Sequence, residues 1–234
     1  MLNSTILLKV KQRLNKLDSR DYDNLQDWQI VEAFIKGQVD WCRRNLHGLN
    51  IVKEGDEQST RRIDDLQILL TRLPLTVTKK DGYYETDPLP TDYLQWKRIT
   101  TKGTSDCCPD PEPIMLYLAE DANVSMLLRD KYKQPDFEWR ESFVTMSSNK
   151  IQIYTANKFE VVSPELIYYK QPRRIEIAGV RNPYTGFIPV VDVPSEFKDD
   201  LVELFIDEAA KIMAGDIESL NQSPRQAQST EGNN

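Results

Sequence analysis

The chain has 234 residues, 39% of them hydrophobic and 29% charged, a composition typical of a soluble protein with one or two domains. Lysine and arginine number 30 against 37 aspartates and glutamates, so the net charge is −7. No apolar run approaches the ~18 residues of a membrane span, and the first residues lack the pattern of a secretory signal. We therefore expect no membrane partner and no broad basic surface for nucleic acid.

The counts of special residues exclude further classes. Three cysteines and one histidine are too few for a disulfide framework or for most cysteine and histidine metal sites. This cysteine usage fits a reducing compartment. Nine glycines are few for a nucleotide-binding fold, and neither GxxxxGK[ST] nor GxGxxG occurs.

The first part of the chain predicts three helices, because apolar residues recur there at helical spacing. The sequence predicts Ser4 as the N-cap of the first and Asn24 as the N-cap of the second. The third is predicted from Ser59 to Leu73, where Pro74 ends it. The apolar positions of the longest, second helix are Leu25, Trp28, Val31, Ile35, Val39 and Cys42, widened by Ile30, Phe34 and Trp41.

The middle of the chain changes to strand patterns. Residues 75–78 and 83–86 flank Asp81-Gly82, and residues 143–146 and 150–154 flank a second turn, so two hairpins are predicted. Further strands are predicted at 95–100, 165–170 and 174–177, a short helix at 123–131 and a loop at 101–113. Frequent prolines, at 164, 172, 183, 189 and 194, predict short or edge strands.

The chain returns to helix near its end. Pro194, Ser195 and Glu196 form a start signal, Gly215 ends the apolar pattern, and residues from 218 onward are polar. The predicted fold class is therefore α+β. Helices from residues 1–74 and 193–215 form one bundle, residues 75–192 are an inserted β-rich subdomain, and residues 216–234 are a polar tail.

The cysteines and the histidine are the first candidates for a chemical site. Cys107 and Cys108 could join Cys42 and His47 around a zinc ion, but neighbouring cysteines point apart and zinc ligands usually come in spaced pairs. We therefore interpret the adjacent pair as semi-buried loop thiols, Cys42 as a core residue and His47 as a surface residue. No serine lies in a strand–turn–helix nucleophile elbow.

Scattered charges supply two further candidates. Asp136 with Glu196 and Lys198 resembles the two halves of a metal-dependent nuclease signature, although the halves are far apart in the sequence. Solvated charge, with Glu196 at a helix start, is the interpretation that we prefer.

A basic and aromatic face for nucleic acid would combine Tyr168 and Tyr169 with Arg173 and Arg174. Packing of the aromatic rings across strands is the preferred alternative. We therefore predict no catalytic, cofactor-binding or metal-binding residues, no cofactor and no enzymatic activity.

The order of four short motifs resembles the head-to-tail connector proteins of tailed bacteriophages, also called portal adaptors or ring proteins. The motifs are WQIVEA at 28–33, LPTDYL at 89–94, LIYYKQPRR at 166–174 (with IQIY at 151–154 in the same β segment) and VPSEFKDDLV at 193–202. The similarity covers residues 20–215, and the ring proteins of crAss-like phages are the most similar in character. The paired cysteines and the long loop around them belong to no connector pattern.

This resemblance implies a structural virion protein without catalytic residues. Connectors assemble, usually as twelve copies, into a ring that docks below the portal protein, contacts other neck or tail ring proteins and lets genomic DNA pass without sequence-specific binding. The expected location is the neck or tail of the virion, after assembly in the host cytoplasm. Two alternatives stay open, namely a phage-encoded nuclease or other nucleic-acid-processing enzyme, and a head or tail completion protein elsewhere in the virion.

Overall fold

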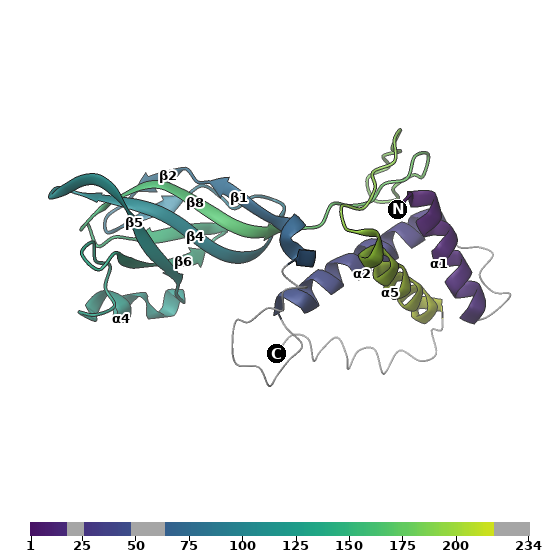
Figure 1. Ribbon diagram of the computed structural model, residues 1–234, viewed down its shortest axis with the longest axis horizontal. Coiled ribbons are helices and arrows are strands. Elements are labelled where there is room, and N and C mark those ends of the chain that lie inside the picture. Colours follow the sequence, from purple (N-terminus) through teal and green to yellow (C-terminus); the bar gives the residue numbers. More distant parts are fainter. Residues whose placement is uncertain (18–25, 48–63, 218–234) are drawn as a thin grey trace. The chain divides into compact units, whose positions relative to one another are not determined.

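The computed structural model describes residues 1–17, 26–47 and 64–217, and the side chains of 15–17, 47, 216 and 217 lie outside the description. It is a mixed α+β fold, as the sequence predicts (Figure 1). The chain divides into a helical unit, residues 1–68 and 172–234, and a sheet unit, residues 69–171. The sequence analysis predicted the boundaries at 74/75 and 192/193. In the structure, residues 172–192 group with the helices instead. The N-cap Asn24, Ser59 and the polar tail from residue 218 lie outside the described residues.

Three helices form the core of the helical unit: α1 (Asn3–Leu17), α2 (Asp27–His47) and α5 (Asp199–Ile217). Helix α5 packs against both α1 and α2. Phe205 of α5 is fully buried and meets Phe34 and Trp41 of α2 edge-on, with ring centroids 5.9 and 5.4 Å apart. Such edge-to-face aromatic pairs add to the free energy that comes from burying their area. Phe34 is buried as predicted, whereas Trp28 is half-buried.

A glycine allows α2 and α5 to approach closely. A Cβ atom added at Gly37 would lie 3.3 Å from the Cβ atom of Glu208 and 3.5 Å from the backbone oxygen of Phe205. The first contact is tight and the second is ordinary van der Waals contact, so a side chain here would require Glu208 or the helix to shift.

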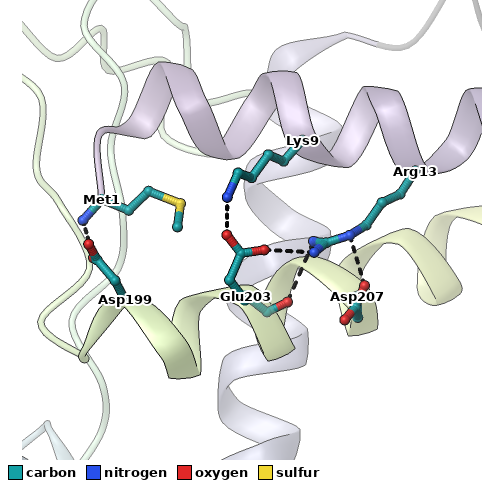
Figure 2. Close-up of polar contacts among 6 residues, drawn as sticks. All are labelled: Met1, Lys9, Arg13, Asp199, Glu203 and Asp207. Atoms are coloured by element: carbon teal, nitrogen blue, oxygen red, sulfur yellow. Dashed lines mark hydrogen bonds and ion pairs between the residues drawn. The ribbon is translucent and has the colours of Figure 1, made fainter.

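Ion pairs join α1 to α5 (Figure 2). Glu203 contacts both Lys9 and Arg13, and the Arg13 Nη2 to Glu203 Oε2 distance is 2.7 Å. Arg13 Nε lies 2.8 Å from Asp207 Oδ1, and the N-terminal amine pairs with Asp199. The three α5 carboxylates are four residues apart and therefore share one face of the helix. This spacing fixes the register of α1 along α5.

The predicted start of the last helix, at Pro194, is wrong. Val193 pairs with Glu176 as an isolated bridge, so the chain is still extended there. Phe197 is then buried in the core, and helix α5 begins at Asp199. Asp199 and Asp200 supply the negative charge that favours a helix N-terminus, the role that the sequence assigned to Glu196.

The sheet unit contains eight strands: β1 (Leu70–Pro74), β2 (Val77–Lys79), β3 (Tyr83–Thr86), β4 (Tyr93–Ser105), β5 (Cys108–Leu118), β6 (Glu141–Ser147), β7 (Lys150–Tyr154) and β8 (Glu160–Lys170). They form one sheet in the order β1-β8-β4-β5-β6-β7-β3-β2, with only the β5–β6 pair parallel. The 3-10 helix η1 (Gln67–Leu69) precedes β1, and η2 (Asp121–Asn123) and α4 (Val124–Arg129) connect β5 to β6.

The connection between β1 and β2 forces this sheet to curl (Figure 1). The two strands are the opposite edges of the sheet, yet only residues 75 and 76 separate them in the chain. Because a residue spans at most ~3.6 Å, the two edges must come close together. Leu75 N–H donates to the Pro164 carbonyl of β8 and Asp87 N–H to the Thr76 carbonyl, at 2.8 and 3.2 Å, as the chain crosses over.

Two sequence predictions in this unit are wrong, and a third fails just after it, in the helical unit. Residues 70–74 form strand β1, because Leu70 pairs with Tyr169 and this tertiary pairing overrides the helical spacing of the leucines. Residues 101–113 form most of the β4–β5 hairpin instead of a loop. The predicted strand at 174–177 is reduced to the single bridge at Glu176.

The prolines lie where the sheet tolerates them. Pro164 lies within the long inner strand β8 and not on an edge, next to Ser163, whose φ is 49°. Thr100 pairs with Glu165 and Lys102 with Val162, so two residues of β8 oppose one of β4 in a bulge. On β5, Met115 N–H points away from β4 to the Arg140 carbonyl at 2.7 Å. By the two-residue period, Pro113 places its nitrogen on this same side of β5, away from β4.

Both hairpins that the sequence predicted are confirmed. Gly82, with φ at 82°, lies in the turn between β2 and β3. Ser148 and Asn149 have φ values of 51° and 61°, as the two-residue turn between β6 and β7 requires.

We predict that Gly103→Ala destabilises the sheet unit by about 1–3 kcal/mol. Gly103 is buried on β4, and an added Cβ would lie 2.9 Å from Ile114 Cγ1 and 3.1 Å from Phe159 Cδ2. Urea unfolding followed by tryptophan fluorescence measures the effect. The exposed neighbour is the control, since Lys102→Ala should stay within about 0.5 kcal/mol of the wild type. Equal stability of the two variants would contradict this packing.

A second prediction concerns the pH dependence of the α1–α5 contact. The hydrogen bond from Lys9, and then Arg13, lowers the pKa of Glu203 below its ordinary value of 4.5. The carboxylate therefore stabilises the fold above about pH 4.5, and this contribution is lost as the pH falls through the lowered folded-state pKa. Solvent screening limits it to about 0.5–1 kcal/mol.

Glu203→Gln should lower the free energy of unfolding by that amount at pH 7, and the difference from the wild type should vanish at low pH. Chemical unfolding at several pH values measures it. Glu138→Gln, an exposed change in the sheet unit, is the control and should show no such difference. A Glu203→Gln difference that persists unchanged in acid would contradict the assignment.

Candidate interaction surface

The segment between β8 and α5 forms an ordered loop whose base is tightly held. Glu176 and Val193 exchange two backbone hydrogen bonds, of 3.1 and 2.8 Å. Asn3, at the start of α1, is buried and its Nδ2 donates to the carbonyls of the same two residues at 2.8 and 3.0 Å. One side chain of the first helix thus clamps both strands of the loop base. We call residues 176–193 the clamped loop.

Hydrogen bonds continue from the base to the tip of the clamped loop. Ala178 N–H donates to Asp192 Oδ1 at 2.7 Å, and Gly179 N–H donates to the Pro189 carbonyl at 3.0 Å. At the tip, Asn182 N–H donates to the Phe187 carbonyl at 2.8 Å, and Asn182 Oδ1 accepts from the Tyr184 N–H at 2.9 Å. The conformation of the loop is therefore defined by its own backbone pairing.

The clamped loop presents large apolar side chains to solvent. Five of them are 52–89% exposed, and we call this set the loop surface: Tyr184, Phe187, Ile188, Val190 and Val191. Single exposed apolar residues are common on proteins, but a contiguous group of this kind usually marks an interaction site. The defined backbone and the apolar side chains together make the loop surface the strongest candidate for binding another protein.

A small pocket lies under the loop, between it and α2. Its lining includes Trp28 and Glu32 of α2 and Ile177 and Phe187 of the loop, and Glu32 forms an ion pair with Arg174 at its wall. The space is about 30 Å³, comparable to the share of one water molecule in liquid water. This pocket is too small for an organic substrate, so we do not consider it a ligand site.

A second group of exposed apolar side chains lies in the sheet unit. Met115 of β5, Met126 of α4, Tyr132 and Trp139 are 58–90% exposed. Met115 N–H donates to the Arg140 carbonyl, and Trp139 is the residue just before Arg140. Methionine and aromatic side chains are typical of adaptable protein-binding surfaces. Each unit therefore has its own exposed apolar group.

Each residue of the candidate nuclease signature has separate partners within its own unit. Asp136 of the sheet unit accepts hydrogen bonds from the backbone of Glu138 and pairs with Lys158 at 3.5 Å. In the helical unit, Glu196 Oε1 accepts the Arg173 N–H at 2.7 Å and Lys198 pairs with Asp64. These contacts account for the three side chains as parts of turns and ion pairs.

The cysteines have two different environments. Cys42 is a buried core residue as predicted, and burial, with a smaller effect of Glu196, raises the pKa of its thiol to about 12. The interpretation of Cys107 and Cys108 as semi-buried loop thiols is wrong, because both are exposed at the tip of the β4–β5 hairpin. The side chain of His47 lies outside the described residues. Among the described residues, no three histidine, cysteine, aspartate or glutamate side chains form a metal-binding group.

The tyrosines of the proposed nucleic-acid face are buried. Tyr168 is 3% and Tyr169 is 6% exposed. Tyr168 stacks on Tyr93 with ring centroids 5.7 Å apart and donates to Asp92 Oδ1 at 3.0 Å. Burial and this carboxylate raise the pKa of Tyr168 to about 12. The preferred interpretation, packing of aromatic rings across strands, is therefore confirmed for Tyr168. Because both tyrosines are buried, their rings are not available to stack on bases.

The sequence analysis missed the loop surface. It used the prolines at 183 and 189 only as punctuation of strands. The signal was present as the apolar run Phe187 to Val191 behind the turn residues Asn182 and Gly186. Such a run reads equally well as a buried strand, so only the structure reveals that these side chains face solvent.

No protein-family model and no curated protein sequence matches this chain. Within the described part of the chain, no helix is both long and apolar enough to span a bilayer.

A third prediction concerns Asp192, whose carboxylate holds the Ala178 N–H. Asp192→Ala should remove about 1 kcal/mol of local stability and speed amide exchange in the clamped loop severalfold. The thermal midpoint of the whole protein should change little, because the loop is outside the helical core. Hydrogen exchange of peptides from 176–193 measures this effect. Asp192→Asn keeps the acceptor oxygen and should retain most of the protection, and equal exchange in all three proteins would contradict the role of Asp192.

Proposed function

We propose that this protein is a structural virion component, a head-to-tail connector of a tailed bacteriophage. In this role it forms a ring below the portal protein, extends the DNA channel and joins other ring proteins of the neck or tail. The observation that carries the proposal is the loop surface, a set of exposed apolar side chains on a loop of defined conformation. The order of the connector-like motifs supports the same assignment.

A ring requires two different surfaces on each subunit. When one surface binds a different surface of the next copy, the contacts close into a ring if the rotation per subunit fits. The helical unit supplies the loop surface, and the sheet unit supplies the group around Met115 and Trp139. Two unlike apolar groups on one chain meet this requirement, whereas a two-fold dimer needs only one.

The remaining features fit the same role. We propose that helices α1, α2 and α5 act as a helical bundle within the ring and that the polar tail, which the sequence predicts at residues 216–234, docks on the portal. Twelve copies are expected from the resemblance. With a net charge of −7 per chain, a channel made of such subunits would hold DNA weakly, because DNA affinity grows with each phosphate that a basic side chain neutralises. The protein would assemble in the host cytoplasm without a membrane, cofactor or catalytic step.

Val191→Glu tests this function through self-assembly. Val191 is 71% exposed, so the variant should fold with an unchanged thermal midpoint, but its charge would be desolvated in a contact between copies. We expect the wild type to sediment as one closed oligomer at high concentration and Val191→Glu to sediment as a single chain.

Leu8→Glu is the matched control, since Leu8 is 68% exposed on α1 of the same unit and gains the same charge. It should assemble as the wild type does. A wild type that stays a single chain at every concentration, or a Val191→Glu protein that still assembles, would count against the connector ring.

A further inference from the structure

The tip of the β4–β5 hairpin carries two adjacent thiols. Ser105 pairs with Cys108, so Asp106 and Cys107 form the two-residue connection between the strands. Cys107 Sγ lies 3.7 Å from the Ser105 hydroxyl oxygen. Both cysteines are free and exposed, while the third cysteine, Cys42, is buried in the other unit. Among the described residues, the two hairpin cysteines are therefore the thiols that solvent and small molecules can reach.

The two thiols also contact each other. A hydrogen bond with the Cys107 side chain, followed by its charge, raises the pKa of the Cys108 thiol. Cys107 lies in the turn itself, whereas Cys108 is the first residue of β5, so we assign the first attack to Cys107 and the resolving step to Cys108.

We propose that Cys107 and Cys108 form a thiol–disulfide exchange site whose substrate class is low-molecular-weight disulfides such as oxidised glutathione. The Cys107 thiolate attacks one sulfur of the disulfide, forms a mixed disulfide and releases one small thiol. The Cys108 thiolate then attacks the Cys107 sulfur and releases the second small thiol. Two protein thiols lose two protons and two electrons in total, and the small disulfide is reduced to two thiols.

The product is a strained ring that is easily reduced. A bond between adjacent cysteines closes eight atoms around one peptide bond. Adjacent Cα atoms are about 3.8 Å apart, whereas disulfides usually join Cα atoms 4.4–6.8 Å apart. Strained and exposed disulfides have less reducing potentials than structural ones, so they are labile. Formation of the disulfide is therefore reversible. The two cysteines stay reduced in a reducing compartment and form the disulfide outside it.

The hairpin is suited to carry such a site. Ring closure takes place within the turn, and the residues that pair β4 with β5 farther down, Thr101 with Ile114, are left unchanged.

Intact mass after exposure to oxidised glutathione tests the proposal. The reduced full-length protein, desalted and kept folded, should lose the mass of two hydrogen atoms and keep no glutathione. Cys107→Ser and Cys108→Ser should each keep one glutathionyl group instead, because no resolving thiol remains. Both positions are exposed, so both variants should match the wild type in circular dichroism. Cys42→Ser, in the buried position, should behave as the wild type does.

Two results would overturn the proposal. One is a wild type that keeps a stable mixed disulfide as the single variants do, and the other is a covalent dimer on a non-reducing gel. Phenylarsine oxide provides an independent probe of the geometry, since its arsenic must bond both sulfurs with loss of one water. We expect one phenylarsenic group on the wild type that survives dilution and none on either single variant, and a wild type without it would show that the sulfurs cannot meet.

Discussion

The antiparallel pairing of β1 with β8 is the interaction on which the architecture depends. Leu70 pairs with Tyr169, so the first and last strands of the sheet unit run side by side and its two chain ends emerge together. A unit whose ends meet can be inserted into another unit without disturbing it. The chain before the insertion provides α1 and α2, and the chain after it provides α5, which packs on both. A helical unit made from both ends of the chain follows from this one strand pair.

The helical unit in turn positions the loop surface. Asn3 at the start of α1 binds the carbonyls at the loop base, and Glu32 of α2 pairs with Arg174 just before the loop. The ion pairs between α1 and α5 fix the helix that carries Asn3. The exposed apolar side chains are therefore held by three separate elements. Such preorganisation reduces the entropy lost on binding, which would suit the ring subunit that we propose.

Local patterns in the sequence were sufficient where the structure itself is local. The first two helices, the turn at Asp81-Gly82, the hairpin around Ser148 and the buried Cys42 were all predicted, because helical spacing and turn chemistry act over a few residues. The predictions failed where distant pairing decides. Leu70 to Pro74 has helical spacing but pairs with β8, and the proline-rich stretch after Cys108 looks like a loop but pairs with β4 as part of strand β5.

The candidate site shows the same limit more sharply. A run such as Phe187 to Val191 does not reveal whether it faces the core or solvent, because that depends on Asn3 and Glu176 far from it in the sequence. The carboxylates and tyrosines that the sequence brought forward are instead engaged in contacts of their own, such as the hydrogen bond from Tyr168 to Asp92. Residue types that could carry chemistry can be read from the sequence. The loop surface, in contrast, is defined by the exposure of its side chains, which only the structure gives.

Electron microscopy of the purified wild-type protein tests the central claim, that this chain is built to form a closed ring, most directly. At concentrations where copies associate, the account predicts annular particles with an open centre and a single rotational symmetry. The sheet units should repeat around the ring with the loop surface buried between neighbours. Particles no larger than one chain, or open filaments and irregular aggregates in place of rings, would contradict it.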